Sequence, residues 1–402
     1  MADQFLATED HSSEQHKGVA ISKIELFLFD EDVRGVAFDV HSGGIDKPEA
    51  ESQRRRFGIV VTTKDGRSGE YIGGRPHIWM QARFLAEQVL GMNALGREHI
   101  YEVSRRHLRK EDRIGACALD NALWDLAGKT AGVPVARLLG GNVESRLPAY
   151  ASTWFGGDEG GLSSPEQFGD FAEECLELGY LGFKMHGWTD GQTARDIAAI
   201  QELGQRLGGR MSLMYDSACH LKTFGDALLV GKACDRAEFF WCEDPYSDGG
   251  LSAHAHRRLR QMIKTPILLG EHVRGVEAMA NLVAADGTDF IRADPDLDIG
   301  ITGTMKIAAL AEAFGLDVEL HGCGPAHRHC MSAIRNTNFY ELGLVGPSRG
   351  GPVTSIYACD YSDALDSVGD DGCFAVPKGP GLGVVYDWEQ VRANLVKHVV
   401  IQ

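Results

Sequence analysis

The chain has 402 residues, 44% of them hydrophobic and 24% charged, which is a globular composition and too apolar for a disordered protein. The formal net charge is −17, and such an acidic surface repels both nucleic-acid phosphates and anionic lipids. No apolar stretch reaches the roughly 18 residues that a membrane span requires. Neither a nucleic acid nor a membrane is therefore expected as a partner.

The N-terminus and the cysteines predict a cytoplasmic protein. Residues 1–18 mix acidic residues with Ser, His and Gln, and they lack the basic start and the apolar run of a signal peptide, so a flexible tail is predicted there. The nine cysteines are an odd number and include no C-x-x-C pair, which favours reduced thiols over a disulfide framework.

Residues 19–145 are predicted to form an α+β domain. A strand is expected at residues 21–29 (ISKIELFLF). A hairpin follows, in which a β-rich run at 57–63 turns and returns at 69–72. Helical sequence then dominates residues 78–139.

The segment at residues 30–47, between the first strand and the hairpin, is predicted to be a mobile loop. Gly35 and other glycines stand in it beside polar residues, next to a rigid strand. We expect this loop to close as a lid over the active site, with Arg34 and His41 contacting the substrate. The arginine run at 54–56 is interpreted as solvent-exposed surface charge.

From residue 147 onward the pattern changes to short apolar or β-branched runs that alternate with amphipathic helical stretches. The runs are LPAYAST, YLGFKMH, MSLMYD, EFFWCED, PILLGE, DFIRAD and DVELHG. This alternation predicts a parallel α/β sheet, and its unit count exceeds that of a typical open nucleotide-binding sheet. Because no glycine-rich phosphate loop follows any run, the sequence predicts a (β/α) barrel that spans residues 146–355. Residues 356–402 are expected to end in a turn-rich hairpin and to return to the first domain.

Chemically reactive side chains stand at the end of nearly every predicted barrel strand. In a (β/α) barrel all strands end at the same face, which carries the active site. Consecutive candidates are spaced by about one βα unit, so we expect their side chains to enter one mouth. The candidates are Lys184, His186, Asp216, Glu243, Glu271, Asp294, His321 and Glu341.

Three of these candidates, Asp216, Glu243 and Glu271, are carboxylates on successive strands. Such a trio repels itself unless a cation lies between its members. An all-oxygen ligand set suits a hard divalent ion, most simply Mg²⁺. A zinc site is a weaker alternative, since soft or imidazole donors flank the acids at Cys219, His220, Cys242 and His272. Adjacent strand residues face opposite sides, however, so Cys242 is expected to point away from Glu243.

Basic side chains flank the three carboxylates. Lys184 and His186 are two residues apart at a strand end and therefore share a face. Asp294 and His321 end neighbouring strands, an arrangement that suits an Asp–His dyad in which the carboxylate orients the imidazole. Two further histidines have no evident partner and are interpreted as structural: His327 and His329.

Several motifs agree in order, spacing and context with one known family. They are ALDNALWDLAGKTAGVPVARLLGG (118–141), the strand-end acids of MYDSA, WCEDP and LLGEH, and ADPDLDIGITG (293–303). On these motifs the chain resembles the enolase superfamily, specifically its mandelate racemase-like subgroup with acid-sugar dehydratases. The resemblance implies an α+β N-terminal capping domain, a (β/α)7β TIM-like barrel and a homo-oligomer.

The same resemblance assigns roles within the site. It implies Mg²⁺ on Asp216, Glu243 and Glu271, together with an Asp294–His321 dyad. It also places Ser152 in contact with the substrate carboxylate, and an acid, Glu341, near that carboxylate.

The chain departs from the subgroup's usual pattern at three positions. The usual Lys-x-Lys is Lys184-x-His186 here, and residues that are usually Asn are Ala218 and His272. These departures rearrange the polar groups that recognise the substrate, and they make His272 a candidate substrate contact. The identity of the sugar acid therefore cannot be copied from a well-known member.

The predicted activity is that of a lyase, the Mg²⁺-dependent dehydration of an aldonate- or aldarate-like sugar acid to a 2-keto-3-deoxy acid. His186 or Lys184 removes the C2 proton to give a metal-stabilised enediolate, and His321 then protonates the departing 3-OH. The alternatives are a racemase or epimerase of a 2-hydroxy acid at the same site and, more remotely, a non-catalytic binding protein.

Overall fold

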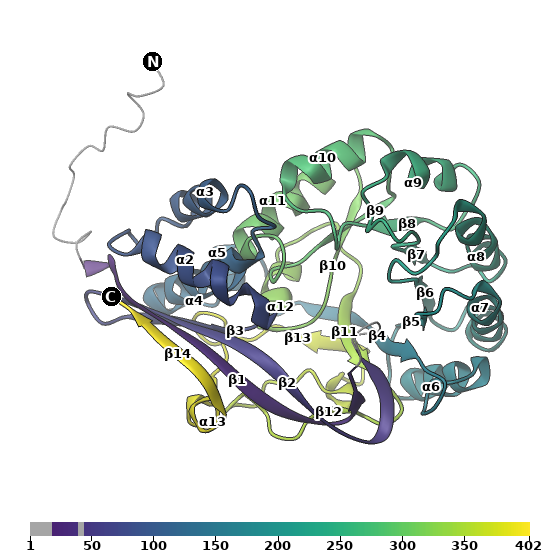
Figure 1. The fold of residues 1–402 in the computed structure, drawn as a ribbon, viewed down its shortest axis with the longest axis horizontal. Helices are drawn as coiled ribbons and strands as arrows, with labels where there is room; N and C mark the ends of the chain where they lie inside the picture. The colour runs from purple at the N-terminus through teal and green to yellow at the C-terminus, as the bar shows by residue number, and fades with distance from the viewer. Residues whose placement is uncertain (1–17, 39–43) are drawn as a thin grey trace.

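The structure of the protein is a computed structural model that describes residues 18–38 and 44–402. Figure 1 shows a sheet with helices packed beside it, adjoining a barrel of strands that is ringed by helices. Residues 1–17 of the predicted tail, and His41, lie outside the described residues. Among the described residues, no helix is both long and apolar enough to cross a membrane.

The sheet belongs to the capping domain and is antiparallel. β1 (Ile21–Ala37) pairs with β2 (Ile45–Thr63), while β3 (Ser68–Ile72) lies beside β2 and β14 (Leu395–Ile401) lies beside β1. The domain's helices are η2 (Pro76–Ile78), α2 (Trp79–Val89), α3 (Arg97–His107), η3 (Ile114–Ala116), α4 (Cys117–Ala131) and α5 (Val135–Leu138). Alternate apolar residues of the strands, such as those at 24 and 26, share one hydrophobic core with the helices.

The prediction of a loop at residues 30–47 is wrong for its described residues on either side of the gap at 39–43. β1 continues to Ala37 and β2 already begins at Ile45, so the two strands form a long arm. Asp30 lies opposite Arg55, and Arg55 Nε donates to its carboxylate at 2.9 Å. Such cross-strand ion pairs join residues far apart in the sequence and stabilise an extension that the polar, glycine-containing sequence does not reveal.

Eight strands form the barrel, and the predicted (β/α)7β order is confirmed. The strands are β4 (Arg146–Gly156), β5 (Gly182–Trp188), β6 (Ser212–Asp216), β7 (Trp241–Glu243), β8 (Ile267–Leu269), β9 (Phe290–Ala293), β10 (Asp317–Leu320) and β11 (Tyr340–Val345). Parallel pairing runs from β4 through β10, and β11 pairs in parallel with β4. Helices between successive strands are α6 (Pro165–Glu177), α7 (Thr193–Leu207), α8 (Phe224–Arg236), α9 (Ala253–Arg260), α10 (Val276–Ala284), α11 (Gly300–Ala313) and α12 (Pro325–Met331).

The barrel interior is filled by a separate apolar cluster. Its members come from different strands and lie packed together: Tyr150, Met214, Trp241, Leu268 and Phe290. The rings of Tyr150 and Trp241 meet edge to face, with centroids 5.5 Å apart. This apolar cluster fills the barrel interior, so the reaction space lies at the barrel mouth.

The C-terminal segment returns to the capping domain, but the hairpin expected near its end is wrong. β12 (Gly351–Pro352) and β14 both pair with β1, and α13 (Trp388–Ala393) precedes β14. Between them, after η4 (Leu365–Ser367), β13 (Cys373–Ala375) pairs antiparallel with the beginning of β4. An ion pair between Arg146 and Asp371, at 2.6 Å, stabilises this long-range pairing instead of a local hairpin.

Candidate active site

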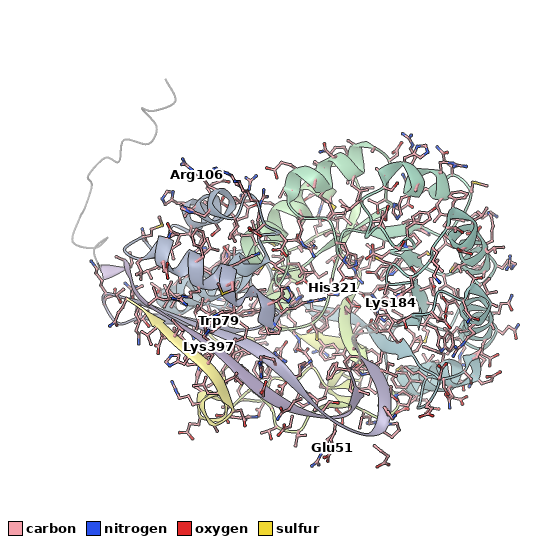
Figure 2. The ribbon with its side chains drawn as sticks, in the orientation of Figure 1. Glu51, Trp79, Arg106, Lys184, His321 and Lys397 are labelled. Atoms are coloured by element: carbon pink, nitrogen blue, oxygen red, sulfur yellow. The ribbon has the colours of Figure 1, made fainter. Side chains whose placement is uncertain are left out.

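The barrel fold brings the predicted side chains to one end. Five of them stand at or just beyond the carboxyl ends of β6 to β10: Asp216, Glu243, Glu271, Asp294 and His321. Lys184 and His186 lie within β5, and Glu341 lies near the start of β11. Strand register places His186 beside Asp216 and Asp216 beside Glu243. Figure 2 labels Lys184 and His321 near the junction of the barrel and the capping domain.

Lys184 is enclosed by carboxylates. Its Nζ lies 3.0 Å from Asp216 Oδ2, 2.9 Å from Glu243 Oε2 and 2.9 Å from Glu341 Oε1, and the side chain is 1% exposed. Burial alone would lower the pKa of Lys184, but Glu243 and Glu341 raise it well above its usual range. Lys184 is therefore suited to hold a positive charge at this point and poorly suited to accept a proton.

Arg292 is a buried member of the site that the sequence reasoning missed. Its Nε lies 2.5 Å from Glu243 Oε1 and its Nη2 lies 2.9 Å from Glu243 Oε2, so Arg292 forms a bidentate ion pair with this carboxylate. The same Nη2 donates to the Tyr150 hydroxyl at 2.9 Å. Arg292 precedes Asp294 by two positions, and the period of a strand could have identified it as a second inward-facing residue.

The carboxylates provide an all-oxygen donor set. Glu243, Asp244 and Glu271 each place an oxygen within 4.8 Å of the other two. Asp216 lies on the neighbouring strand, where Lys184 contacts one of its oxygens and the Ala218 N–H donates to the other. Asp244 was not predicted, and neither of its buried oxygens has a hydrogen-bond partner among the described residues. Burial and the neighbouring carboxylates Glu271 and Glu243 raise the pKa of Asp244 well above its usual range. A cation among these oxygens would favour the charged form, and the all-oxygen donor set fits a hard divalent ion such as Mg²⁺.

Donors of the zinc alternative also lie next to this set. Cys219, Asp244 and His272 each have a donor atom within 4.8 Å of the others. Cys242 lies in the hydrophobic core, in agreement with the expectation that it faces away from Glu243. Asp244 is thus shared by two groups of donors, one hard and one partly soft.

His186 bridges the barrel wall and the carboxylates. Its Nδ1 lies 2.7 Å from the Thr153 carbonyl oxygen, and its Nε2 lies 3.1 Å from Asp216 Oδ2. The carbonyl contact requires an N–H at Nδ1, so Nε2 is the nitrogen that faces the reaction space. The ring is fixed in one orientation by these two contacts.

His321 is held between two carboxylates. Its Nδ1 lies 2.7 Å from Asp294 Oδ2, and its Nε2 lies 3.4 Å from Glu271 Oε1. Burial would lower the pKa of His321, but Glu271 and Asp294 together raise it to about 10. This imidazole therefore carries a proton at neutral pH and can act as an acid.

His327 joins the dyad from the opposite side, which the interpretation of it as structural overlooked. Its Nε2 lies 3.2 Å from Asp294 Oδ1, so two imidazoles share one carboxylate. Burial would raise the pKa of Asp294, yet hydrogen bonds from the two histidines hold it well below its usual range. His329 does fit a structural role, because its ring accepts from the Ala136 N–H and contacts the Leu382 carbonyl.

Ser152 and Glu341 lie beside Lys184 at the junction of β4 and β11. Ser152 is fully buried, and its hydroxyl oxygen has no hydrogen-bond partner among the described residues. Glu341 Oε2 accepts from the Gly322 N–H at 2.7 Å, while its other oxygen contacts Lys184. Ser152 lies opposite Lys184 on the neighbouring strand, and a buried hydroxyl without a partner at this position is suited to a substrate carboxylate.

The other predicted substrate contacts are more dispersed. His272 Nε2 lies 3.4 Å from Asp244 Oδ2, and this side chain is 40% exposed. Arg34 lies on β1, where it pairs with Glu51 at 3.4 Å and borders the cavity described next. His41 lies outside the described residues.

A cavity of about 800 Å³ lies between the β1–β2 arm, the barrel mouth and the segment around residues 351–366. Arg54 and Arg56 line it, so the interpretation of the arginine run as surface charge is wrong for these two. Both lie within 3.2 Å of the buried Glu31 carboxylate. Arg55 points to the opposite face of β2, where it pairs with Asp30. The alternation of a strand explains this division of three consecutive arginines.

Two family models match this chain. The model described as "Mandelate racemase / muconate lactonizing enzyme, N-terminal domain" matches residues 63–140, and the model described as "Enolase C-terminal domain-like" matches residues 167–391. Together they cover most of the capping helices and the barrel.

Relatives and solved structures of similar fold carry dehydratase names. A D-gluconate dehydratase of Thermoproteus tenax is 27% identical over 68% of this chain, and the chain spans only 54% of that protein. An L-rhamnonate dehydratase of Saccharopolyspora erythraea is 27% identical over 95% of this chain and 92% of its own length. The structure of a D-glucarate dehydratase from Agrobacterium tumefaciens, complexed with magnesium, superimposes with a TM-score of 0.84 at 27% identity, covering 94% of this chain and 100% of that one.

Proposed function

Because this chain belongs to the mandelate racemase and muconate lactonizing enzyme family of the enolase superfamily, we propose that it dehydrates a sugar acid to a 2-keto-3-deoxy acid with Mg²⁺ as its cofactor. The protein is an enzyme, a lyase, and relatives over most of its length are named as dehydratases. The observation that carries the proposal is the position of His321 between Asp294 and Glu271, while His186 contacts a different member of the carboxylate group. An acid and a separate base are what elimination of water requires.

The metal would be held by Asp216, Glu243 and Glu271, and it would supply positive charge that stabilises negative charge developing on the substrate carboxylate. Lys184 and the Ser152 hydroxyl would hold the same carboxylate from the other side. Lys184 keeps its proton, because three carboxylates surround it.

Proton movement is then assigned to the two imidazoles. His186 Nε2 removes the C2 proton, since its Nδ1 is bound to the Thr153 carbonyl and cannot accept one. His321 Nε2 donates its proton to the departing 3-OH, which leaves as water, and Asp294 keeps the ring oriented throughout. The resulting enol tautomerises to the 2-keto-3-deoxy acid.

The test is a panel of aldonates and aldarates incubated with the Mg²⁺-loaded enzyme in D₂O and followed by proton NMR. Loss of water with deuterium incorporated at C3 of a 2-keto-3-deoxy product is expected for at least one acid. Inversion and exchange at C2 without loss of water would instead identify a racemase or epimerase, and would overturn the proposal.

A further inference from the structure

The geometry points to a carboxylate-binding site in the cavity between the β1–β2 arm and the barrel mouth, formed by Arg54 and Arg56, which would make the preferred substrate a dicarboxylic sugar acid. This inference rests on the proposed function, because it assigns the far end of the same substrate. It distinguishes aldarates, which end in a second carboxylate, from aldonates, which end in an uncharged hydroxymethyl group.

The position of the cavity relative to the reacting groups supports this assignment. Its barrel wall includes residues two positions beyond four predicted site residues, two of them on β4 and β11 and two in the loops after β9 and β10, so it adjoins the site on the side of the capping domain. These wall residues are Trp154, Asp296, Cys323 and Gly343. A substrate whose first carboxylate lies beside Lys184 would therefore extend its other end into the cavity.

Arg54 and Arg56 face this space together. They are two residues apart on β2 and share a face, and both approach the same oxygen, Glu31 Oε2, at 2.6 Å and 3.2 Å. The other oxygen of Glu31 is buried and has no hydrogen-bond partner among the described residues. Two guanidinium groups therefore share one carboxylate oxygen, and the next acid that acts on Arg56 is Asp296, which already accepts from the Tyr71 hydroxyl.

The two arginines differ in their electrostatics. Burial would lower the pKa of Arg56, but Glu31, Tyr357 and Asp296 raise it. The pKa of Arg54 is lowered from its usual value, first by burial and then by the neighbouring Arg56. A second anion next to Arg54 would relieve this repulsion. The planar donor fork of arginine matches the two oxygens of a carboxylate.

The other charged groups that line the cavity have partners of their own or lie exposed. Tyr71 Oη donates to Asp296 at 2.8 Å, and Arg328 pairs with Asp363 at 2.5 Å. Arg34 and Arg349 pair with acids on the capping domain and on α6, at 3.4 Å and 2.8 Å. Among the described charged residues at the wall, Arg54 and Arg56 are thus half-buried cations that share a single oxygen of one acid.

The experiment compares diacid and monoacid substrates that share one configuration: glucarate with gluconate, and galactarate with galactonate. The wild type is expected to have the higher kcat/KM on the diacid of each pair. Arg54→Met and Arg56→Met should each reduce the ratio of diacid to monoacid kcat/KM by about 30-fold, as expected for one charge-assisted hydrogen bond. Most of this change should be in KM, because the contact is remote from the reacting carbons.

Two further variants make the result decisive. Arg55→Met removes an arginine from the same strand but from its other face, so it should leave the ratio unchanged. Glu31→Gln removes the competing carboxylate while preserving its shape, and it should lower the KM for the diacid. The arginine variants should raise the KM for the diacid, whereas Glu31→Gln should lower it. A folding defect would not lower KM.

The outcomes separate this inference from the proposed function. Dehydration of the monoacids at a rate equal to that of the diacids, with a ratio unaffected by Arg54→Met and Arg56→Met, would overturn the carboxylate site and leave the dehydratase proposal standing. Failure to dehydrate any acid of the panel would overturn the proposed function itself.

Discussion

The two imidazoles of the site differ in what holds them, and the difference indicates how the work is divided. His321 is bound to Asp294, a carboxylate outside the predicted metal ligands, and His327 reinforces that carboxylate. His186 is bound to a backbone carbonyl and to Asp216, which is itself a predicted metal ligand. When Asp216 and Glu271 serve as ligands, His186 loses its carboxylate partner, whereas His321 loses its contact with Glu271 but keeps Asp294. One histidine is therefore built to stay charged and the other to be released as a base.

The largest effect is expected from Glu243→Gln, because this carboxylate links Lys184, Arg292 and the predicted metal site. Dehydration should fall by ~10³-fold or more, since several kcal/mol of charge stabilisation are lost with the ligand. Mg²⁺ affinity, measured by calorimetry, should fall with it. A joint loss of activity and Mg²⁺ affinity would show that the two histidines act on a substrate bound to the metal.

Glu319→Gln is the matched control for that variant. Glu319 is also a fully buried barrel glutamate, but it accepts hydrogen bonds from Asn338 and lies outside the carboxylate group. It should retain Mg²⁺ affinity and activity. Normal turnover by Glu243→Gln, or activity that follows zinc content instead of magnesium content, would show the ligand assignment to be wrong.

The next largest effects should separate the two histidines directly. His321→Asn and His186→Asn should each lower dehydration by ~10²- to 10⁴-fold, the usual range for loss of an acid or base. Exchange of the C2 proton with D₂O, followed by NMR, should survive in His321→Asn and vanish in His186→Asn. The reverse pattern would exchange the roles, and exchange that vanishes only in Lys184→Met would make the lysine the base.

The barrel and its strand-end residues could be predicted because each strand is marked by a short apolar run and the residues that directly follow it. Each buried strand ends in a reactive side chain, and fold geometry alone brings those ends together. Asp244 was missed for a local reason. Its φ of 40° is a left-handed conformation that breaks the strict alternation of a strand, so the rule that neighbours face opposite sides does not hold there.

The capping domain was predicted less well because its form depends on contacts between distant segments. The arm at Asp30–Ala37 is charged and contains a glycine, so nothing local identifies it as a strand. Its pairing with the arginine run across the hairpin becomes visible only in three dimensions, and so does the division of Arg54 and Arg56 from Arg55. His327 was missed for the same reason, since its partner Asp294 lies 33 positions away.

A smaller effect is expected at His327, which contacts the catalytic carboxylate and not the substrate. His327→Asn should lower kcat by about 10-fold with little change in KM, the scale seen when a group that orients another is removed. The neighbouring His329→Asn is the control, since His329 contacts only backbone groups; it should reduce thermal stability more than kcat. Equal kinetic losses in both variants would reduce His327 to a packing role.

The stability of the protein should also depend on pH through His321. In the folded protein the pKa of His321 is raised to about 10, whereas an unfolded histidine titrates near 6.5. Between these values the folded state binds the additional proton, so the stabilisation from His321 is complete below pH 6.5 and is lost as the pH rises toward 10. The free energy of unfolding, measured by denaturant titration for wild type and His321→Asn, should therefore differ most in mild acid and converge at high pH. A difference independent of pH would mean that His321 is not held charged in the fold, and the distinction between the two imidazoles would fail.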